Sequence, residues 1–342
     1  MPMPRHFRPW ATLFVLLLLA CRAAAASPEG IVIRFSHVVA DDTPKGIAAR
    51  AFKRIAESRS NGRIRVEVYP RSTLFDDNDE ILALQMGAVE IVAPSLSKFG
   101  KIGFPSFELF DLPFLFRDTE EVHRIMRGPV GRQLLADLNR QQILGLGYLD
   151  NGFKQMSANR PLLRRSDYAG LRMRIQPSRI IAAQMIALGA QAVPLALSET
   201  RLALSTRVVD GTENPLSNFV TQGIHEVQSH LSLTQHGYLG YAVVTSQRFW
   251  QQLKPADREL LEGAMHEAIE IGNNVASAHE RRALDVIHAW KETHVHRPSE
   301  AQRSELEAAM RPVYERAKTR IGARLLEQTL HELSEARLRR RP

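Results

Sequence analysis

The segment IVIRFSHVVADDTPKGIAARAFKRIAESRSNGRIRVEVYP, residues 31–70, decides the fold class. Residues 31–35 form a short run rich in β-branched and aromatic side chains, which favours a strand. Residues 43–57 begin with a proline in the first turn and carry apolar side chains at helical spacing, so they are predicted to form a helix. Residues 64–68 alternate apolar and charged side chains and end before a proline, which is the pattern of a second strand.

The alternation of strand and helix continues downstream. A helix is predicted at about residues 78–86, closed by Gly87, and a third strand at residues 89–93. A β-α-β-α-β order implies a parallel sheet with helices on both faces. Ligands of such sheets bind at the carboxyl ends of the strands. At those ends the sequence places the polar residues Ser36, His37, Arg71, Ser72 and Ser95.

A second unit of the same kind lies further along the chain. Residues 143–152 and 153–161 are interpreted as two strands, and a third strand at residues 171–176 precedes a helix at about residues 178–188. From residue 254 onward the sequence is mostly helical. We therefore predict an α/β protein of two lobes, each a mixed or mostly parallel sheet flanked by helices, with a long helix spanning both lobes.

The same pattern gives provisional lobe boundaries. Lobe I is expected to comprise residues 27–150 together with about 238–275. Lobe II and the C-terminal helices are expected to comprise residues 151–237 together with about 276–330. Residues 331–342 are rich in arginine and are expected to form a disordered, solvated tail.

The N-terminus has the organisation of a signal peptide. Basic residues precede the apolar run at residues 11–20, and four alanines follow at residues 23–26, so we expect export to the periplasm and removal of residues 1–26. An alternative is a lipoprotein signal, in which Cys21 would carry a lipid anchor. Cys21 is the only cysteine of the chain, which excludes an intramolecular disulfide and cysteine–metal chemistry.

The charge of the chain does not predict nucleic-acid binding. The net charge is +8, but three of the cations lie in the leader and four arginines lie in the tail. The remainder is close to balanced, and no basic stripe interleaved with aromatic residues is present.

Signatures of catalysis are missing from the sequence. It contains no G-x-S-x-G, no phosphate-binding G-x-x-x-x-G-K and no dinucleotide-binding G-x-G-x-x-G after a strand. His225 and His230 are five residues apart, whereas the zinc motif H-E-x-x-H places its histidines four apart. The acidic pair Asp76 and Asp77 is interpreted as a turn or helix cap. We expect no catalytic residue, no cofactor and no metal, and a cofactor-independent lyase or isomerase is the remaining enzyme alternative.

Two cations in the pattern are candidates for anion binding. Arg174 alternates with apolar residues in the strand at 171–176, and a guanidinium matches a carboxylate with two parallel hydrogen bonds. Lys45 lies in the first turn of a predicted helix, where a cation is unfavourable unless an anion accompanies it. Both side chains could instead lie in solvent, and the residue pattern alone leaves that alternative open.

Seven segments, in order along the chain, resemble the periplasmic solute-binding subunits of tripartite ATP-independent (TRAP) transporters, and within them the branch that binds four-carbon dicarboxylates. The similarity extends from about Ile31 to Gly322. The segments are FSHVVADDTPKG, LQMGAVEIVAPSLSKF, FDLPFLF, LGYLDNGFKQMSANRPL, GLRMRIQPS, VVDGTENPLSNF and HEVQSHLSLTQHGYLGYAVV.

The resemblance implies a clamshell that encloses an organic anion, and it assigns residues to that ligand. Arg174 in G-L-R-M-R would form a salt bridge with the substrate carboxylate, supported by Asn214 in D-G-T-E-N-P and by Lys154 in N-G-F-K. Lys45 in T-P-K-G would bind the distal carboxylate. The positions of Ser95, Tyr241 and His37 match polar positions in or near the cleft.

The resemblance also implies delivery of the ligand to a membrane permease of a small and a large subunit, by a monomeric binding protein without ATP. Leu216 and Leu197 stand where relatives commonly carry aromatic residues, so the choice among succinate, fumarate and malate stays open. The alternatives within binding proteins are a sugar acid, keto acid or aromatic acid as ligand, or a sensor that presents its ligand to a receptor.

Overall fold

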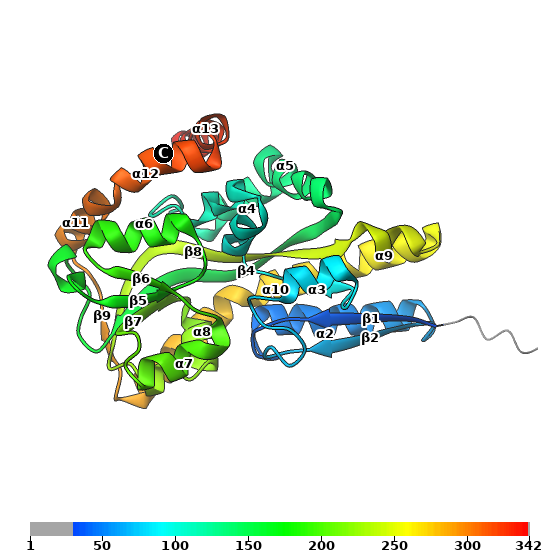
Figure 1. The fold of residues 1–342 in the computed structure, drawn as a ribbon, viewed down its shortest axis with the longest axis horizontal. Helices are drawn as coiled ribbons and strands as arrows, with labels where there is room; N and C mark the ends of the chain where they lie inside the picture. The colour runs from blue at the N-terminus through cyan, green and yellow to red at the C-terminus, as the bar shows by residue number, and fades with distance from the viewer. Residues whose placement is uncertain (1–29, 341–342) are drawn as a thin grey trace, which may run out of the picture.

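The computed structural model describes residues 30–340, so the predicted signal peptide and Cys21 lie outside the described residues. One mixed sheet of nine strands runs through the molecule in the order β2-β1-β3-β8-β4-β7-β5-β6, with β9 beside β8 (Figure 1). The strands are β1 (Ile31–Ser36), β2 (Ile64–Tyr69), β3 (Ile91–Val92), β4 (Ile143–Ala158), β5 (Arg172–Ile175), β6 (Gln191–Pro194), β7 (Gly211–Asn214), β8 (His230–Ser246) and β9 (His294–His296).

Helices cover both faces of this sheet, which confirms the predicted fold class. They are α2 (Pro44–Arg59), α3 (Glu80–Met86), α4 (Thr119–Arg127), α5 (Pro129–Asp137), α6 (Arg179–Leu188), α7 (Leu197–Ser205), α8 (Leu216–Thr221), α9 (Gln247–Gln252), α10 (Pro255–Trp290), α11 (Glu300–Met310), α12 (Pro312–Ile321) and α13 (Ala323–Arg339). In residues 30–340 no helix is both long enough and apolar enough to cross a membrane.

Lobe I is built on the strand–helix alternation that opens the chain. β1 pairs in parallel with β2, where Ile31 lies opposite Ile64, and also in parallel with β3. The predicted β-α-β-α-β order is therefore confirmed. β3 pairs antiparallel with β8, which makes the sheet mixed rather than wholly parallel.

The two lobes share two long antiparallel strands. The sequence predicts two separate strands at residues 143–161, but the structure has a single strand, β4, of 16 residues. β4 pairs with β8 along its length, interrupted by irregularities such as the one between Asp150 and Gly152. Gly152 allows the close approach of α10, because a Cβ there would lie 2.7 Å from Cδ of Glu280. One end of this strand pair belongs to lobe I beside β3, and the other belongs to lobe II beside β7.

Helix α10 is the third element that both lobes share. It is 36 residues long and packs against α2 in lobe I and α8 in lobe II. Gly272 on α10 permits this packing, since a Cβ there would lie 2.8 Å from Cβ of Ala48. The predicted boundary near residue 150 falls inside β4, and we propose the same division into lobes here.

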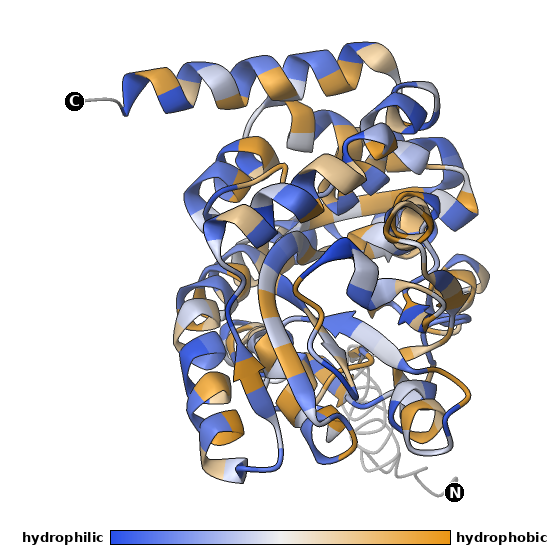
Figure 2. Cartoon of the chain, turned by 90° about the vertical axis from the view of Figure 1, so that its left-hand side faces the viewer, coloured by the Kyte–Doolittle hydropathy of each residue, from blue (hydrophilic) through white to orange (hydrophobic). Residues whose placement is uncertain are grey.

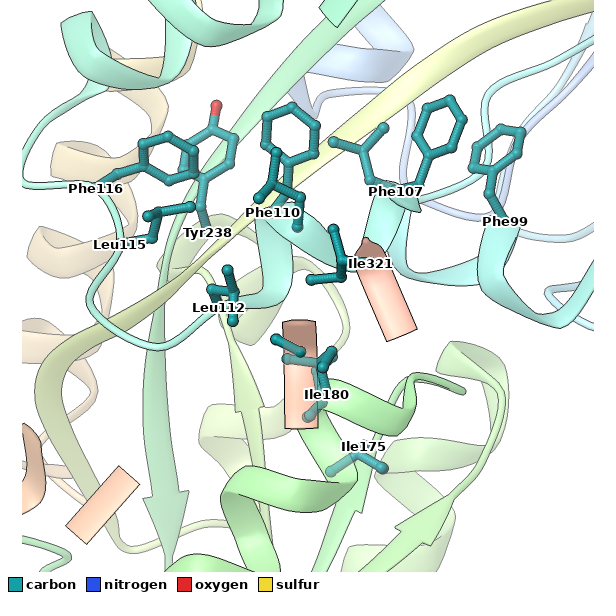
Figure 3. Close-up of a cluster of buried hydrophobic side chains, with 14 of the residues drawn as sticks. Phe99, Phe107, Phe110, Leu112, Leu115, Phe116, Ile175, Ile180, Tyr238 and Ile321 are labelled. Atoms are coloured by element: carbon teal, nitrogen blue, oxygen red, sulfur yellow. The ribbon is translucent and has the colours of Figure 1, made fainter. Parts of the chain in front are cut away.

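A shared apolar core holds the lobes together on one side of the sheet. Phe99 and Phe107 stack with ring centroids 4.5 Å apart, in the segment that follows β3. Ile175 from β5 and Ile180 from α6 belong to the same cluster, although both lie in lobe II (Figure 3). A separate core in lobe I packs the sheet against α2 and α10.

The expectation of a disordered basic tail is wrong for residues 331–339, which belong to helix α13. This helix lies along one edge of the molecule (Figure 2) and buries Leu326 and Leu333. Arg337 donates a hydrogen bond of 2.7 Å to Glu121, and Arg340 donates one of 2.8 Å to Asp118. Arg337 and Arg340, which look like part of a solvated tail in the sequence, therefore pair with the acidic start of α4.

Candidate functional site

A small polar cavity lies where the two lobes meet. Its volume is about 20 Å³, which is room for about one water molecule. A solute of several carbon atoms does not fit this cavity as it stands in the structure. Lobe I contributes Val38, Val39, Asp77, Ser95, Lys98, Leu239 and Tyr241 to the lining, and lobe II contributes Arg174, Gln176, Leu197, Asn214 and Asn218.

Arg174 lies in β5 and points into this cavity. Its side chain is among the largest of the buried ones, with 1% of the residue exposed. Nε and Nη2 donate to the carbonyl oxygen of Leu195 at 3.0 and 2.7 Å, while Nη1 has no hydrogen-bond partner in the described part of the chain. Burial lowers the pKa of Arg174, and the charges of Asp77 and Glu213 oppose that shift. The guanidinium remains a cation at neutral pH because its ordinary pKa is so high.

Arg172, on the same strand, has a different environment. Its side chain is partly exposed and donates to both carboxylate oxygens of Asp210, at 3.0 and 2.8 Å. Arg172 is therefore a neighbour of the site and not part of the cavity lining.

Asn214 ends β7 and faces the same cavity as Arg174. It is 2% exposed, and its Nδ2 donates to the hydroxyl of Thr212 at 3.2 Å. Its Oδ1 has no hydrogen-bond partner within residues 30–340. The structure thus brings together two of the residues that the sequence predicts for one carboxylate.

Lys45 is buried in lobe I, in the first turn of α2. Thr43 caps this helix by accepting a hydrogen bond from the backbone N–H of Gly46. The ammonium of Lys45 donates to the carbonyl of Ala93 at 2.9 Å and lies 3.6 Å from the centre of the Tyr241 ring. Burial lowers the pKa of Lys45 to about 7. Like Arg174, this cation contacts neutral groups rather than a carboxylate.

Ser95 and Tyr241 line the cavity, as the resemblance predicts. The hydroxyl of Ser95 donates to Oε1 of Gln176 at 2.5 Å and thereby joins the two lobes. Tyr241 accepts a hydrogen bond of 2.6 Å from Nδ2 of Asn151, and burial raises the pKa of its phenol. The ring of Tyr241 therefore has a fixed orientation beneath Lys45.

Sequence reasoning missed a group of charges in the lobe I wall. Lys98 is buried and forms ion pairs with Asp77 and Glu80. Asp77 also accepts a hydrogen bond of 2.5 Å from the backbone N–H of Leu197 in lobe II. The interpretation of the acidic pair as a turn or helix cap agrees with both residues: Asp76 accepts from Asn78 in the turn before α3, and Asp77 accepts from the first N–H of α7. The sequence did not indicate that this helix lies in the other lobe. No short-range spacing links Asp77 to Lys98 or to Leu197.

Lys154 lies in lobe II but does not line the cavity. Its ammonium is 3.1 Å from Oε1 of Glu213 and 3.5 Å from Oδ1 of Asp111. The other oxygen of Glu213 is 3.2 Å from Nε2 of His236. Lys154 is thus paired with two carboxylates inside the protein.

His37 lies in lobe I and, like Lys154 and Lys45, is not among the residues that line the cavity. It is fully buried, and neither ring nitrogen has a hydrogen-bond partner in the described residues. Burial and the charge of Lys45 lower its pKa to about 3, so the imidazole is neutral. Within residues 30–340 there is no group of three histidine, cysteine or carboxylate side chains placed to hold a metal ion.

Two α/β lobes joined by continuous strands and a long helix, with a polar cavity between them, define a two-lobed solute-binding protein. The family described as DctP, bacterial extracellular solute-binding protein, family 7, matches residues 35–320. The chain belongs to this family, which confirms the resemblance seen in its sequence. Members of the family are solute-binding proteins of transport systems rather than enzymes.

Individual relatives agree with this assignment. The C4-dicarboxylate-binding periplasmic protein DctP of Rhodobacter capsulatus is 48% identical over 299 residues, which cover 87% of this chain and 90% of the relative. A TRAP periplasmic solute-binding protein from Shewanella oneidensis with bound succinate has a TM-score of 0.87 at 41% identity, covering 89% of this chain and 99% of that one. A TRAP protein from Pseudomonas aeruginosa PAO1 with bound L-malate has a TM-score of 0.81 at 41% identity, covering 84% and 99%.

Proposed function

We propose that this protein captures a four-carbon dicarboxylate of the succinate, fumarate or malate type in the periplasm. The observation that carries the proposal is a pair of buried cations without carboxylate partners: Arg174 in the lobe II wall, and Lys45 in lobe I next to the cavity residue Tyr241. A buried charge is costly unless a counter-charge and hydrogen bonds accompany it. Two such cations, one in each lobe, match the two charges of one small dianion.

The proposed contacts divide the ligand between the lobes. Arg174 binds one carboxylate through its free Nη1, and Asn214 supports the same carboxylate. In the structure the Nδ2 of Asn214 is bonded to Thr212 and its Oδ1 is free, so donation to a ligand carboxylate requires the amide group to rotate and present Nδ2. Lys45 binds the distal carboxylate, and the face of the Tyr241 ring supports its charge.

The other predicted site residues have lesser roles in this proposal. Ser95 contributes a hydroxyl to the cavity wall. Lys154 is already neutralised by internal carboxylates, and it supports the lobe II wall instead of touching the ligand. His37 is neutral and stays behind Lys45.

Both lobes must contact the ligand for binding to close them, because only a difference in affinity between two states can shift their balance. The cavity in the closed arrangement is too small to admit a dicarboxylate from solution. We therefore infer that the lobes open, capture the dianion by charge and close around it. We propose further that a monomer releases the unchanged ligand to a TRAP membrane permease of a small and a large subunit. The naming of similar proteins as periplasmic TRAP solute-binding proteins supports a role in such a transporter.

Calorimetry with a panel of acids tests this proposal. Succinate, fumarate and L-malate should each bind with 1:1 stoichiometry, whereas butyrate, which has a single carboxylate, should bind far more weakly. Galactonate and a keto acid serve as probes of the alternative ligands. Preference for either of them over every dicarboxylate would contradict the proposal, and so would chemical conversion of the ligand observed by NMR.

A further inference from the structure

Two hydrogen bonds cross from one cavity wall to the other. One joins the hydroxyl of Ser95 to Gln176 at 2.5 Å, and the other joins a carboxylate oxygen of Asp77 to the backbone N–H of Leu197 at 2.5 Å. Beside them, Leu197 packs with Val38 and Val39 in a small apolar cluster of its own. Only the bond of Asp77 involves a charged group, and hydrogen bonds to charged groups are stronger than neutral ones.

Asp77 is held in lobe I in a fixed orientation. Its side chain is 8% exposed, and that of its partner Lys98 is 5% exposed. One oxygen of Asp77 accepts from Lys98 and the other accepts from Leu197. Glu80 holds Lys98 from a second direction at 2.5 Å, so the ammonium cannot follow Asp77 if Asp77 moves.

Leu197 presents one of the N–H groups that a helix leaves unsatisfied at its start. It is the first residue of α7, and the preceding residue, Ala196, has no side chain that can cap the helix. Asp77 therefore acts as a cap supplied by the opposite lobe. Its negative charge also lies at the positive end of the α7 dipole, which strengthens the bond.

We infer that Asp77 is a positioning residue that ties the lobes together when the site is closed. Asp77 lies in lobe I and Leu197 in lobe II, so parting the lobes breaks their bond. Lys98 and the Leu197 N–H are not among the groups assigned to the ligand, so an enclosed dicarboxylate does not have to displace either partner of Asp77. This inference rests on the proposed function, in which closure of the lobes retains the bound dicarboxylate.

Spin labels placed on the two lobes measure closure directly. Met86 in lobe I and Leu202 in lobe II are exposed, and a Cys21→Ser background leaves no other cysteine in the chain. Distances between labelled cysteines at these two positions are recorded without ligand and over a succinate titration, and dissociation of succinate is followed by stopped flow. The substitution is Asp77→Asn, and the matched control is Asp79→Asn, because Asp79 is exposed and its side chain makes no capping bond.

We expect Asp77→Asn to reduce the population with short distances, to require roughly tenfold more succinate for closure and to release succinate roughly tenfold faster. Asp77→Glu keeps the carboxylate and should therefore retain part of the closure and of the slow succinate release seen in the parent. Leu197→Pro removes the N–H at a helix position that tolerates proline, and should loosen closure even if Asp77→Asn fails to fold.

Three results would overturn the inference: Asp77→Asn behaving like Asp79→Asn, Asp77→Asn closing more readily than the parent, or a parent without a short-distance population under any condition. A parent that fails to bind succinate in calorimetry, yet loses short distances in Asp77→Asn, would refute the ligand assignment and leave the role of Asp77 intact.

Discussion

The cavity between the lobes and the ion cluster around Lys154 bury positive charge in opposite ways. In the cluster, Lys154 faces the carboxylates of Glu213 and Asp111. Burial alone would raise the pKa of Glu213, but Lys154 and His236 outweigh it and lower that pKa. At the interlobe site, Arg174 lines the cavity and Lys45 lies just outside it, over the ring of Tyr241. Both cations face neutral groups, namely carbonyl oxygens and that ring. A buried cation therefore does not by itself mark a binding site. A buried cation without an internal carboxylate does, because it leaves a counter-charge to be supplied from outside.

Disrupting the ion cluster around Lys154 should have the largest effect, and the quantity that changes should be the stability of the folded protein. Lys154→Met leaves two buried carboxylates without their cation, so the free energy of unfolding should drop by about 3–5 kcal/mol. Urea denaturation of the ligand-free protein measures this change. A variant as stable as the parent would contradict the contrast between the two regions.

Removing the cation that lines the cavity should instead weaken ligand binding and leave the stability of the ligand-free protein unchanged or increased. Arg174→Met should weaken succinate binding by about 2–5 kcal/mol, which is a loss of roughly thirtyfold or more in affinity. The ligand-free protein should be as stable as the parent or more stable, because the substitution leaves no buried carboxylate without its ion-pair partner. Calorimetry and thermal unfolding together test both parts.

Arg172→Met is the matched control for that experiment, since Arg172 pairs with Asp210 away from the cavity. It should bind succinate as the parent does. Equal affinity in Arg174→Met would remove Arg174 from the proposed site.

The smallest effect concerns pH and sharpens the role of Lys45. Its pKa in the ligand-free protein is about 7 because of burial, and a bound carboxylate should raise it. Binding then takes up a proton above pH 7, so affinity should fall with rising pH by at most about tenfold per unit. His37 does not contribute, because its pKa of about 3 leaves it neutral throughout.

Calorimetry in buffers of different ionisation heat measures this proton uptake between pH 6.5 and 9. Lys45→Arg keeps its charge at every pH in this range and should abolish the slope. The stability of the ligand-free protein should move the other way. The folded pKa of Lys45 lies below its unfolded value, so the penalty for burying its charge is complete below pH 7 and is relieved as pH rises toward the unfolded value. A flat affinity profile in the parent would exclude Lys45 as a titrating contact.

Local periodicity was enough to predict the architecture of lobe I. Residues 31–93 alternate strand and helix with short connections, and the parallel pairing of β1 with β2 and β3 follows from that order. The same reasoning failed at Asn151 and Gly152, which look like a turn between two strands but form an irregularity within β4. Whether such residues end a strand or bend it depends on α10, which packs there from more than a hundred residues away.

The site could be predicted in part, for the same reason. Arg174 and Lys45 stand out because their local patterns are unusual for charged residues, and the family resemblance connects them to a ligand. The pattern around Asp77 is unremarkable, and its link to Lys98 and Leu197 exists only in the folded chain. For Lys154 the sequence suggests a ligand contact, because no local pattern reveals that Glu213 and Asp111 already neutralise its charge.

The apolar core that joins the lobes has a mechanical consequence. Ile175 and Ile180 of lobe II share that core with Phe107 and Phe110 of lobe I, on the side where α6 and α12 lie. Full separation of the lobes would expose this core to water. A rotation of the lobes that keeps this core buried therefore costs less free energy. Under the proposed function, such a motion would admit the solute from the side away from this core, and a membrane partner would meet the two lobes at that rim.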